Sequence, residues 1–192
     1  MIPGYLIMEK CAGFFVTIIL MLSLCLKGTA KECESPVYTQ YVAEITSAFA
    51  KEMNKEFCLD CGASGGEMPY DVEAISIKLV SYQSATVEQA RELEIKTTER
   101  LVQIINAHEK IRPFLRESPF PSSRARVNIS FRNPKKTLSS SNDVALVLQA
   151  KNKIHYCAKD PNNQYLFIDI KEEPYEEARK IVLGNSAKND SQ

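Results

Sequence analysis

The sequence predicts a two-layer α+β fold, with a mainly antiparallel sheet of about five strands and helices packed on one face. Two periodicities support this class. Segments with apolar residues three and four positions apart predict helices, and segments of alternating apolar and polar residues predict strands. Most of the strands follow one another directly, so the expected order is α-β-α-β-β-β-β-α. A composition of 25% charged and 44% hydrophobic residues excludes a disordered chain.

The N-terminal segment has the features of a secretory signal. Residues 11–26 carry no charge, lysines flank them, and residues 28–30 offer a small-x-small cleavage site. We therefore predict cleavage after Ala30 and an exported protein, periplasmic or extracellular. Two alternatives fit the same residues. Residues 11–26 can stay as a membrane anchor, although they span only about 24 Å of a hydrocarbon core of roughly 30 Å. Cys25 can carry a lipid, although Leu24 departs from the lipobox pattern.

The rest of the chain is expected to form one domain. A length of 192 residues is typical of a single domain with a short appendage. We predict a signal peptide at 1–30, an α+β domain at 31–184 and a flexible polar tail at 185–192.

The first half of the domain is predicted to contain two helices and one strand. Pro36 suits the first position of a helix that ends near Cys58. The glycines of residues 62–66 are interpreted as a tight loop that requires positive φ. A strand follows at 75–79. Thr86 then starts a long helix with a capping-box spacing, and Pro113 closes it after about residue 111.

The second half is predicted to be a meander of strands. After a proline-rich loop, alternation predicts strands at residues 127–131, 144–150, 154–158 and 165–170. The last of these is apolar on both faces except at Asp169. Pro174 opens a final helix, and Gly184 is expected to be its C-cap.

Cys58 and Cys61 form a CxxC pair, which can be a redox dithiol, half of a zinc site or a disulfide. Redox pairs use a helix N-terminus to lower the pKa of the first thiol, whereas this pair follows the predicted C-terminus of a helix. A zinc site needs two more ligands, and no second CxxC is present. We therefore predict a structural disulfide or free thiols, with no metal and no cofactor.

Residues 62–66 also match the pattern G-x-S-x-G, with Ser64 as the formal nucleophile. A nucleophile elbow lies between a strand and the helix that follows it, but here the predicted order is helix, loop, strand. Asp143 and His155 complete the chain order of a catalytic triad. Because the chain has only 2 histidines, this match carries little weight. His155 and Cys157 share a strand face, and His108 is expected to be structural.

The clearest surface signal is the basic segment, residues 110–136, which carries eight Lys or Arg residues and one Glu in a chain of zero net charge. The candidate contact residues are Arg112, Arg116, Arg124, Arg126, Arg132, Lys135 and Lys136. Guanidinium groups suit phosphates and carboxylates, so we expect an anionic envelope component or an acidic protein as partner. Zero net charge argues against nucleic acid.

The sequence thus favours a non-catalytic binding or envelope-associated module over an enzyme. The alternative is a small extracytoplasmic enzyme, thiol-based or hydrolytic, centred on Cys58, Cys61 and residues 62–66. No catalytic residue is assigned, because no motif combines the required residues with the required structural context.

Overall fold

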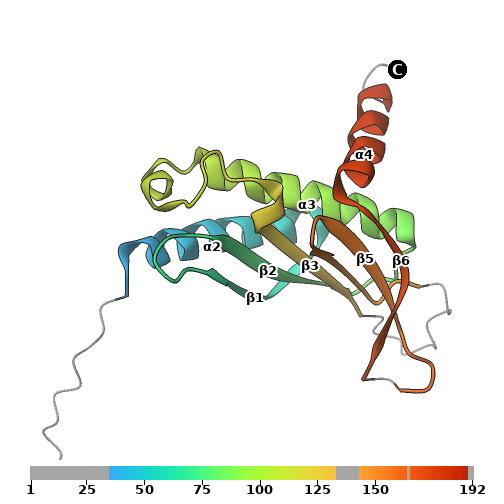
Figure 1. Ribbon diagram of the computed structural model, residues 1–192. Helices are drawn as coiled ribbons and strands as arrows, with labels where there is room; N and C mark the ends of the chain where they lie inside the picture. Colours follow the sequence, from blue (N-terminus) through green and yellow to red (C-terminus); the bar gives the residue numbers. More distant parts are fainter. Residues whose placement is uncertain (1–34, 133–142, 164, 190–192) are drawn as a thin grey trace, which may run out of the picture. The chain divides into compact units, whose positions relative to one another are not determined.

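The computed structural model describes residues 35–132, 143–163 and 165–189. These residues form one mixed sheet with helices on one face, which confirms the predicted α+β class (Figure 1). The predicted signal peptide lies outside the described residues. In the described part of the chain, no helix is both long enough and apolar enough to cross a membrane.

The sheet has 6 strands in the order β1-β2-β3-β4-β5-β6, one more than predicted. The elements are α2 (Val37–Phe57), β1 (Asp60–Glu67), β2 (Ala74–Ser81), α3 (Val87–Ala107), the 3-10 helices η1 (Glu109–Phe114) and η2 (Ser122–Arg124), β3 (Ala125–Phe131), β4 (Leu146–Ala150), β5 (Lys153–Lys159), β6 (Phe167–Pro174) and α4 (Tyr175–Asn189). Only β2 and β3 pair in parallel, because α3 carries the chain back between them.

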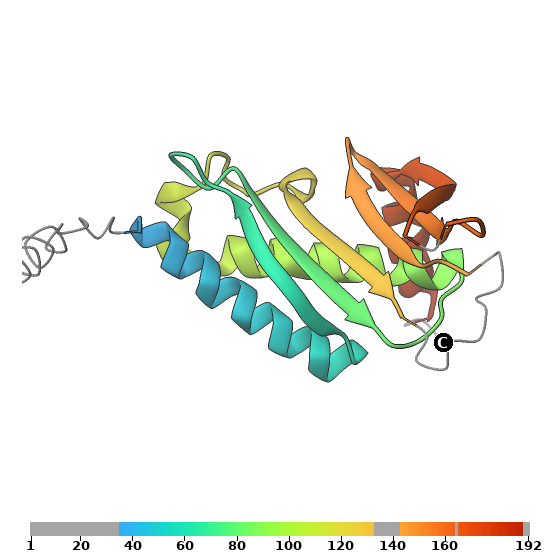
Figure 2. The ribbon, with the colours of Figure 1, turned by 90° about the horizontal axis from the view of Figure 1, so that it is seen from below.

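The hydrophobic core lies between the sheet and α2 and α3. Ile77 of β2 and Val127 of β3 are register partners, and both point into this core. Phe49 of α2 and Leu101 of α3 are fully buried above them. Figure 2 views the sheet from the side away from these helices. No described helix covers that face of the sheet. The sheet therefore offers one open face and two edges, β1 and β6.

The start of α3 agrees with the prediction, whereas its end does not. The Thr86 hydroxyl accepts a hydrogen bond from the Gln89 amide at 3.3 Å, and the Gln89 side chain accepts one from the Thr86 amide at 3.0 Å. The helix stops at Ala107, earlier than expected, and η1 continues to Phe114. The α-helix ends where His108 takes an extended backbone, with φ −82° and ψ 98°, and Pro113 lies inside η1.

The main correction concerns the glycine-rich segment, which forms strand β1 rather than a loop. All eight of its residues are exposed, so it has no alternating apolar pattern to detect. None of the glycines in the described part has a positive φ; the chain instead turns at Cys58, with φ 53°. Gly66 is required for close approach, because a Cβ there would overlap the carbonyl oxygen of Ala74.

The last helix also differs from its prediction. Helix α4 runs to Asn189, so Gly184 lies inside it and is not a C-cap. An interior glycine costs a helix only about 1 kcal/mol relative to alanine, which its neighbours can offset. Ala178 and Val182 of α4 are buried, while Ile181 is 45% exposed.

Candidate functional site

The CxxC pair does not form a disulfide. Cys58, Cys61 and Cys157 are free thiols, and the first two are exposed. Cys58 ends α2 in a left-handed conformation, and Cys61 lies in β1 with its Sγ 3.7 Å from the carbonyl oxygen of Ala63. Across residues 35–132, 143–163 and 165–189, no group of three His, Cys, Asp or Glu side chains is placed to hold a metal ion.

The structure does not bring the residues of the formal catalytic triad together. Ser64 pairs with Ile77, so it lies on the helix-covered side of the sheet. His155 pairs with Leu148 and Glu172 on the open face. Their strands, β1 and β5, are four inter-strand spacings apart, which corresponds to about 19 Å. Proton transfer between Ser64 and His155 is therefore excluded in this fold.

A small polar cluster on the open face joins β5 to β6. Asp169 accepts a hydrogen bond from the Cys157 thiol at 3.0 Å and lies 3.3 Å from Nδ1 of His155. Burial, followed by the hydrogen bond to Asp169, raises the pKa of Cys157 to about 12. Cys157 and then His155 lower the pKa of Asp169. The thiol stays protonated at neutral pH, so Cys157 is not an activated nucleophile.

Three arginines of the basic segment form ion pairs with acidic side chains. The ion pairs are Arg116 with Asp71 and Glu73, Arg124 with Glu73 and Glu117, and Arg126 with Glu67. Four carboxylates thus face three guanidinium groups at the end of the sheet where the β1–β2 connection lies. An anionic ligand would have to compete with these carboxylates for the same arginines.

Two further candidate contact residues, Arg112 and Arg132, lie apart from this cluster. Arg132 follows the end of β3, about 20 Å along the strand from Arg126. Arg112 donates to the carbonyl oxygen of Asn106 at 3.1 and 3.3 Å. Lys135 and Lys136 lie outside the described residues.

A buried ion pair fastens β6 to α3. Arg91 of α3 donates to both carboxylate oxygens of Glu173, at 2.6 and 3.0 Å, and the two side chains are only 10% and 11% exposed. The Tyr156 hydroxyl donates to the same carboxylate at 2.5 Å. Burial alone would raise the pKa of Glu173, but the hydrogen bonds from Arg91 and Tyr156 outweigh it and lower that pKa.

Glu94, one turn further along α3, has no such partner. Its side chain is fully buried, and neither carboxylate oxygen has a hydrogen-bond partner among the residues that the structure describes. Burial raises the pKa of Glu94 to about 8, and the neighbouring Thr98 hydroxyl opposes this only in part. The carboxyl group is therefore largely protonated at neutral pH.

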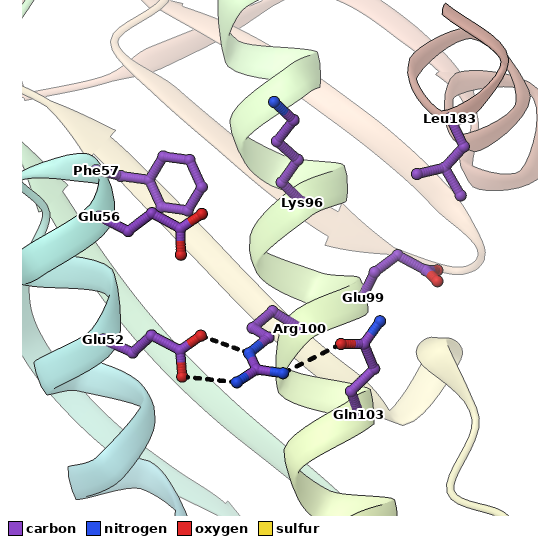
Figure 3. A pocket seen from close by; sticks show the side chains of 8 residues that line it. All are labelled: Glu52, Glu56, Phe57, Lys96, Glu99, Arg100, Gln103 and Leu183. Atoms are coloured by element: carbon purple, nitrogen blue, oxygen red, sulfur yellow. Dashed lines mark hydrogen bonds and ion pairs between the residues drawn. The ribbon is translucent and has the colours of Figure 1, made fainter. Parts of the chain in front are cut away.

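A groove of about 440 Å³ lies where α2, α3 and α4 meet (Figure 3). Its lining residues are Glu52, Glu56, Phe57, Lys96, Glu99, Arg100, Gln103 and Leu183. Arg100 crosses it and binds Glu52 at 2.5 and 3.1 Å and Gln103 at 3.3 Å. Only two lining side chains are apolar, whereas small-molecule sites are predominantly apolar. This groove is therefore a weak candidate for a ligand pocket.

The feature that stands out is an exposed apolar run that leads from the β5–β6 turn into the start of β6. The exposed fractions are 82% for Tyr165, 54% for Leu166, 50% for Phe167 and 43% for Ile168. In the register with β5, Phe167 pairs with Lys159 and Ile168 with Ala158, so the two side chains point to opposite faces. The other edge strand, β1, contains no large apolar residue.

The fold and these sites define a two-layer α+β domain with two free sheet edges, one of them apolar. No protein-family model matches the chain, and comparisons with curated proteins and with solved structures found no match.

Proposed function

We propose that this chain is a non-catalytic binding module that docks an extended segment of another polypeptide along the free edge of β6. The observation that carries the proposal is the run of four consecutive exposed apolar residues, 165–168, which spans the end of the β5–β6 turn and the first two residues of the edge strand β6. Edge strands present unpaired N–H and C=O groups, and an added strand satisfies them.

The two halves of β6 differ in how the edge is protected. The second half has a register shift against β5, the charged residue Lys171 and the terminal Pro174, all of which discourage strand addition. Residues 165–168 have no charge and no proline, and the two of them that lie in β6, Phe167 and Ile168, pair with β5 without a register shift. In the described part of the chain, no backbone hydrogen bond joins the outer side of Phe167 or Ile168 to another element. The first half is thus open to a partner strand.

The site also has anchors and a rigid support. Phe167 and Ile168 offer one apolar contact on each face of the sheet, which is how added strands acquire sequence specificity. The buried pair of Arg91 and Glu173 holds the other end of β6 on α3. Because the edge strand is already ordered in the free protein, binding carries a smaller free-energy cost for ordering it.

The proposal can be tested by selecting peptides from a displayed library of extended decapeptides on the immobilised full chain. Peptides bound by the wild-type protein should lose affinity by about tenfold or more for the double variant Phe167→Lys/Ile168→Lys, because both anchors become charged. Ile181→Lys is the matched control, since Ile181 is exposed to the same degree on α4, away from the edge. We expect its affinities to change by less than about twofold.

A selection that yields no peptide dependent on Phe167 and Ile168 contradicts the proposal. The triple variant Arg124→Ser/Arg126→Ser/Arg132→Ser, assayed with anionic vesicles and the same peptides, tests the basic segment separately. If this variant alone loses binding, the contact surface is the basic segment rather than β6.

We further propose that the module acts after export. Residues 11–26 and the small residues at 28–30 support this, and they lie outside the described residues. The intact mass of the native protein should correspond to a chain that begins at Lys31. A mass that includes residues 1–30, with or without a lipid on Cys25, contradicts cleavage after Ala30.

A further inference from the structure

We propose that the segment docked on β6 runs antiparallel to it and carries a lysine or arginine that pairs with Asp169, two residues before a large apolar residue that packs on Phe167. This inference rests on the proposed function, because it requires that the edge accepts a strand. It names the partner by its chemistry, as an extended basic and apolar segment of another polypeptide.

Alternate residues of β6 turn their backbone groups toward the free edge. The Leu166 carbonyl oxygen accepts a hydrogen bond at 3.0 Å from the residue that follows β5, so Leu166 points inward. The Cys157 carbonyl oxygen accepts one at 2.7 Å from Ala145, just before β4, so Cys157 points away from its register partner Asp169. Because the direction alternates along a strand, Phe167 and Asp169 point outward. An antiparallel strand can exchange two hydrogen bonds with each of them.

The side chains of Phe167 and Asp169 also share the open face of the sheet. Asp169 contacts the side chains of Cys157 and His155 on that face. Phe167 is two positions from Asp169, with no register shift between them, so it points to the same face. An added strand therefore places two side chains, two positions apart, beside Phe167 and Asp169. The residue between them lies beside Ile168 on the other face.

Asp169 is the residue of this edge that selects a charge. Its side chain is 59% exposed, and within the described part of the chain its one ion-pair partner is His155. The Cys157 thiol and then His155 lower the pKa of Asp169, so the carboxylate is ionised at neutral pH. Each of these side chains contacts a different carboxylate oxygen, which fixes the orientation of the group. A carboxylate oxygen has two lone pairs, so both can accept a further hydrogen bond from a lysine or arginine.

The neighbouring carboxylates of β6 are paired already. Glu172 binds Lys153 at 2.6 Å, and Glu173 is held by its buried ion pair on α3. Both lie beyond the register shift, whereas Asp169 lies on the same side of it as Phe167 and Ile168. Residues 167–169 are thus the stretch of β6 that a partner can pair with, and Asp169 is its one charged residue.

The nearest lysines do not neutralise Asp169. Lys171 lies 3.3 Å from Glu173 and over the ring of the buried Tyr156, on the helix-covered face. Lys159 pairs with Phe167 from the inner side, on β5, and no ion pair joins it to Asp169 in the part of the chain described. A cation supplied by the docked strand approaches Asp169 from the free side.

Helix α4 does not obstruct this stretch. It leaves the C-terminal end of β6, while residues 167–169 begin at the opposite end of the strand, next to the β5–β6 turn (Figure 1). Tyr175, the first residue of α4, donates a hydrogen bond to Glu99 of α3 at 3.1 Å, so the helix starts toward α3 and not along the outer edge. A partner segment can therefore reach residues 167–169 without displacing a described element.

The experiment measures the affinity of synthetic peptides for the full chain by calorimetry at low ionic strength, where exposed ion pairs are screened least. The probes are the selected peptides whose binding depends on Phe167 and Ile168. We expect them to carry a lysine or arginine two residues before a large apolar residue. Replacing that basic residue by glutamine should weaken binding to the wild-type protein about threefold to fivefold, the effect of an exposed ion pair.

Asp169→Asn completes a double-mutant cycle. Asparagine has the same shape and can accept the hydrogen bond of the Cys157 thiol, so this variant should fold. In it, the same change in the peptide should alter affinity by less than about twofold. Glu172→Gln is the matched control, since Glu172 is 52% exposed on the same face, and it should keep the full wild-type loss. Asp169→Lys should reverse the preference, binding the peptide with glutamate at that position more tightly than the one with lysine.

The outcomes separate this inference from the proposed function. Peptides that depend on Phe167 and Ile168 but carry no basic residue at that position overturn the inference and leave the proposed function standing. An equal loss in wild type and Asp169→Asn overturns it as well, and so does a loss that only Glu172→Gln removes. A selection that yields no peptide dependent on Phe167 and Ile168 contradicts the proposed function, and this inference falls with it.

Discussion

Glu173→Ala is expected to lower the free energy of unfolding by about 3 to 5 kcal/mol, one of the two largest effects expected for this protein. The substitution leaves the Arg91 guanidinium charged and buried, without the carboxylate that accepts its two hydrogen bonds. The Tyr156 hydroxyl also loses its acceptor. Urea denaturation at neutral pH measures the change.

Glu172→Ala is the control at the adjacent position. Glu172 is 52% exposed and pairs with the exposed Lys153, so its loss should cost less than about 1 kcal/mol. Tyr156→Phe keeps the ion pair and removes one hydrogen bond, so an intermediate cost of about 1 kcal/mol is expected. Equal effects of Glu173→Ala and Glu172→Ala would show that the pair with Arg91 does not hold β6 in place.

The second large effect is the pH dependence that Glu94 imposes on stability. Its pKa is about 8 in the folded protein, against an unfolded value of about 4.3. The folded state thus binds the proton more tightly, so stability is full below pH 4 and falls as the pH rises to about 8. The loss amounts to about 3 to 4 kcal/mol by pH 7.

Glu94→Gln should remove this dependence, because glutamine does not ionise. Between about pH 4 and pH 8 the wild-type protein should lose several kcal/mol more of unfolding free energy than the variant. Glu92→Gln is the control on the same helix, since Glu92 is exposed and pairs with Lys96. If wild type and Glu94→Gln change in parallel with pH, then Glu94 is ionised in the folded protein and the assignment is wrong.

The parts of the fold that were predictable have signals that are local in the sequence. Thr86 and Gln89 marked the start of α3, and alternation marked β2 and β3. Strand β1 was not predicted because its residues are small and exposed and give no apolar alternation. They are held in strand conformation by pairing with β2, which is a non-local interaction. The extent of α4 beyond Gly184 was missed because an interior glycine is only a mild helix breaker.

The candidate sites were harder to predict than the fold. Arg91 and Glu173 are 82 residues apart, and neither stands out in its own segment. The apolar pattern of residues 165–168 was visible, but a strand that is apolar on both faces is typical of a sheet centre. Only the strand order puts β6 at an edge and turns this pattern into an exposed surface.

The central claim is that binding takes place at the edge of β6. The most direct measurement is amide hydrogen exchange along the full chain, with and without a saturating selected peptide. We expect exchange to slow in residues 165–173 and to stay unchanged in residues 110–132. Slowing confined to residues 110–132, with none in β6, would contradict the claim and favour the basic segment as the contact surface.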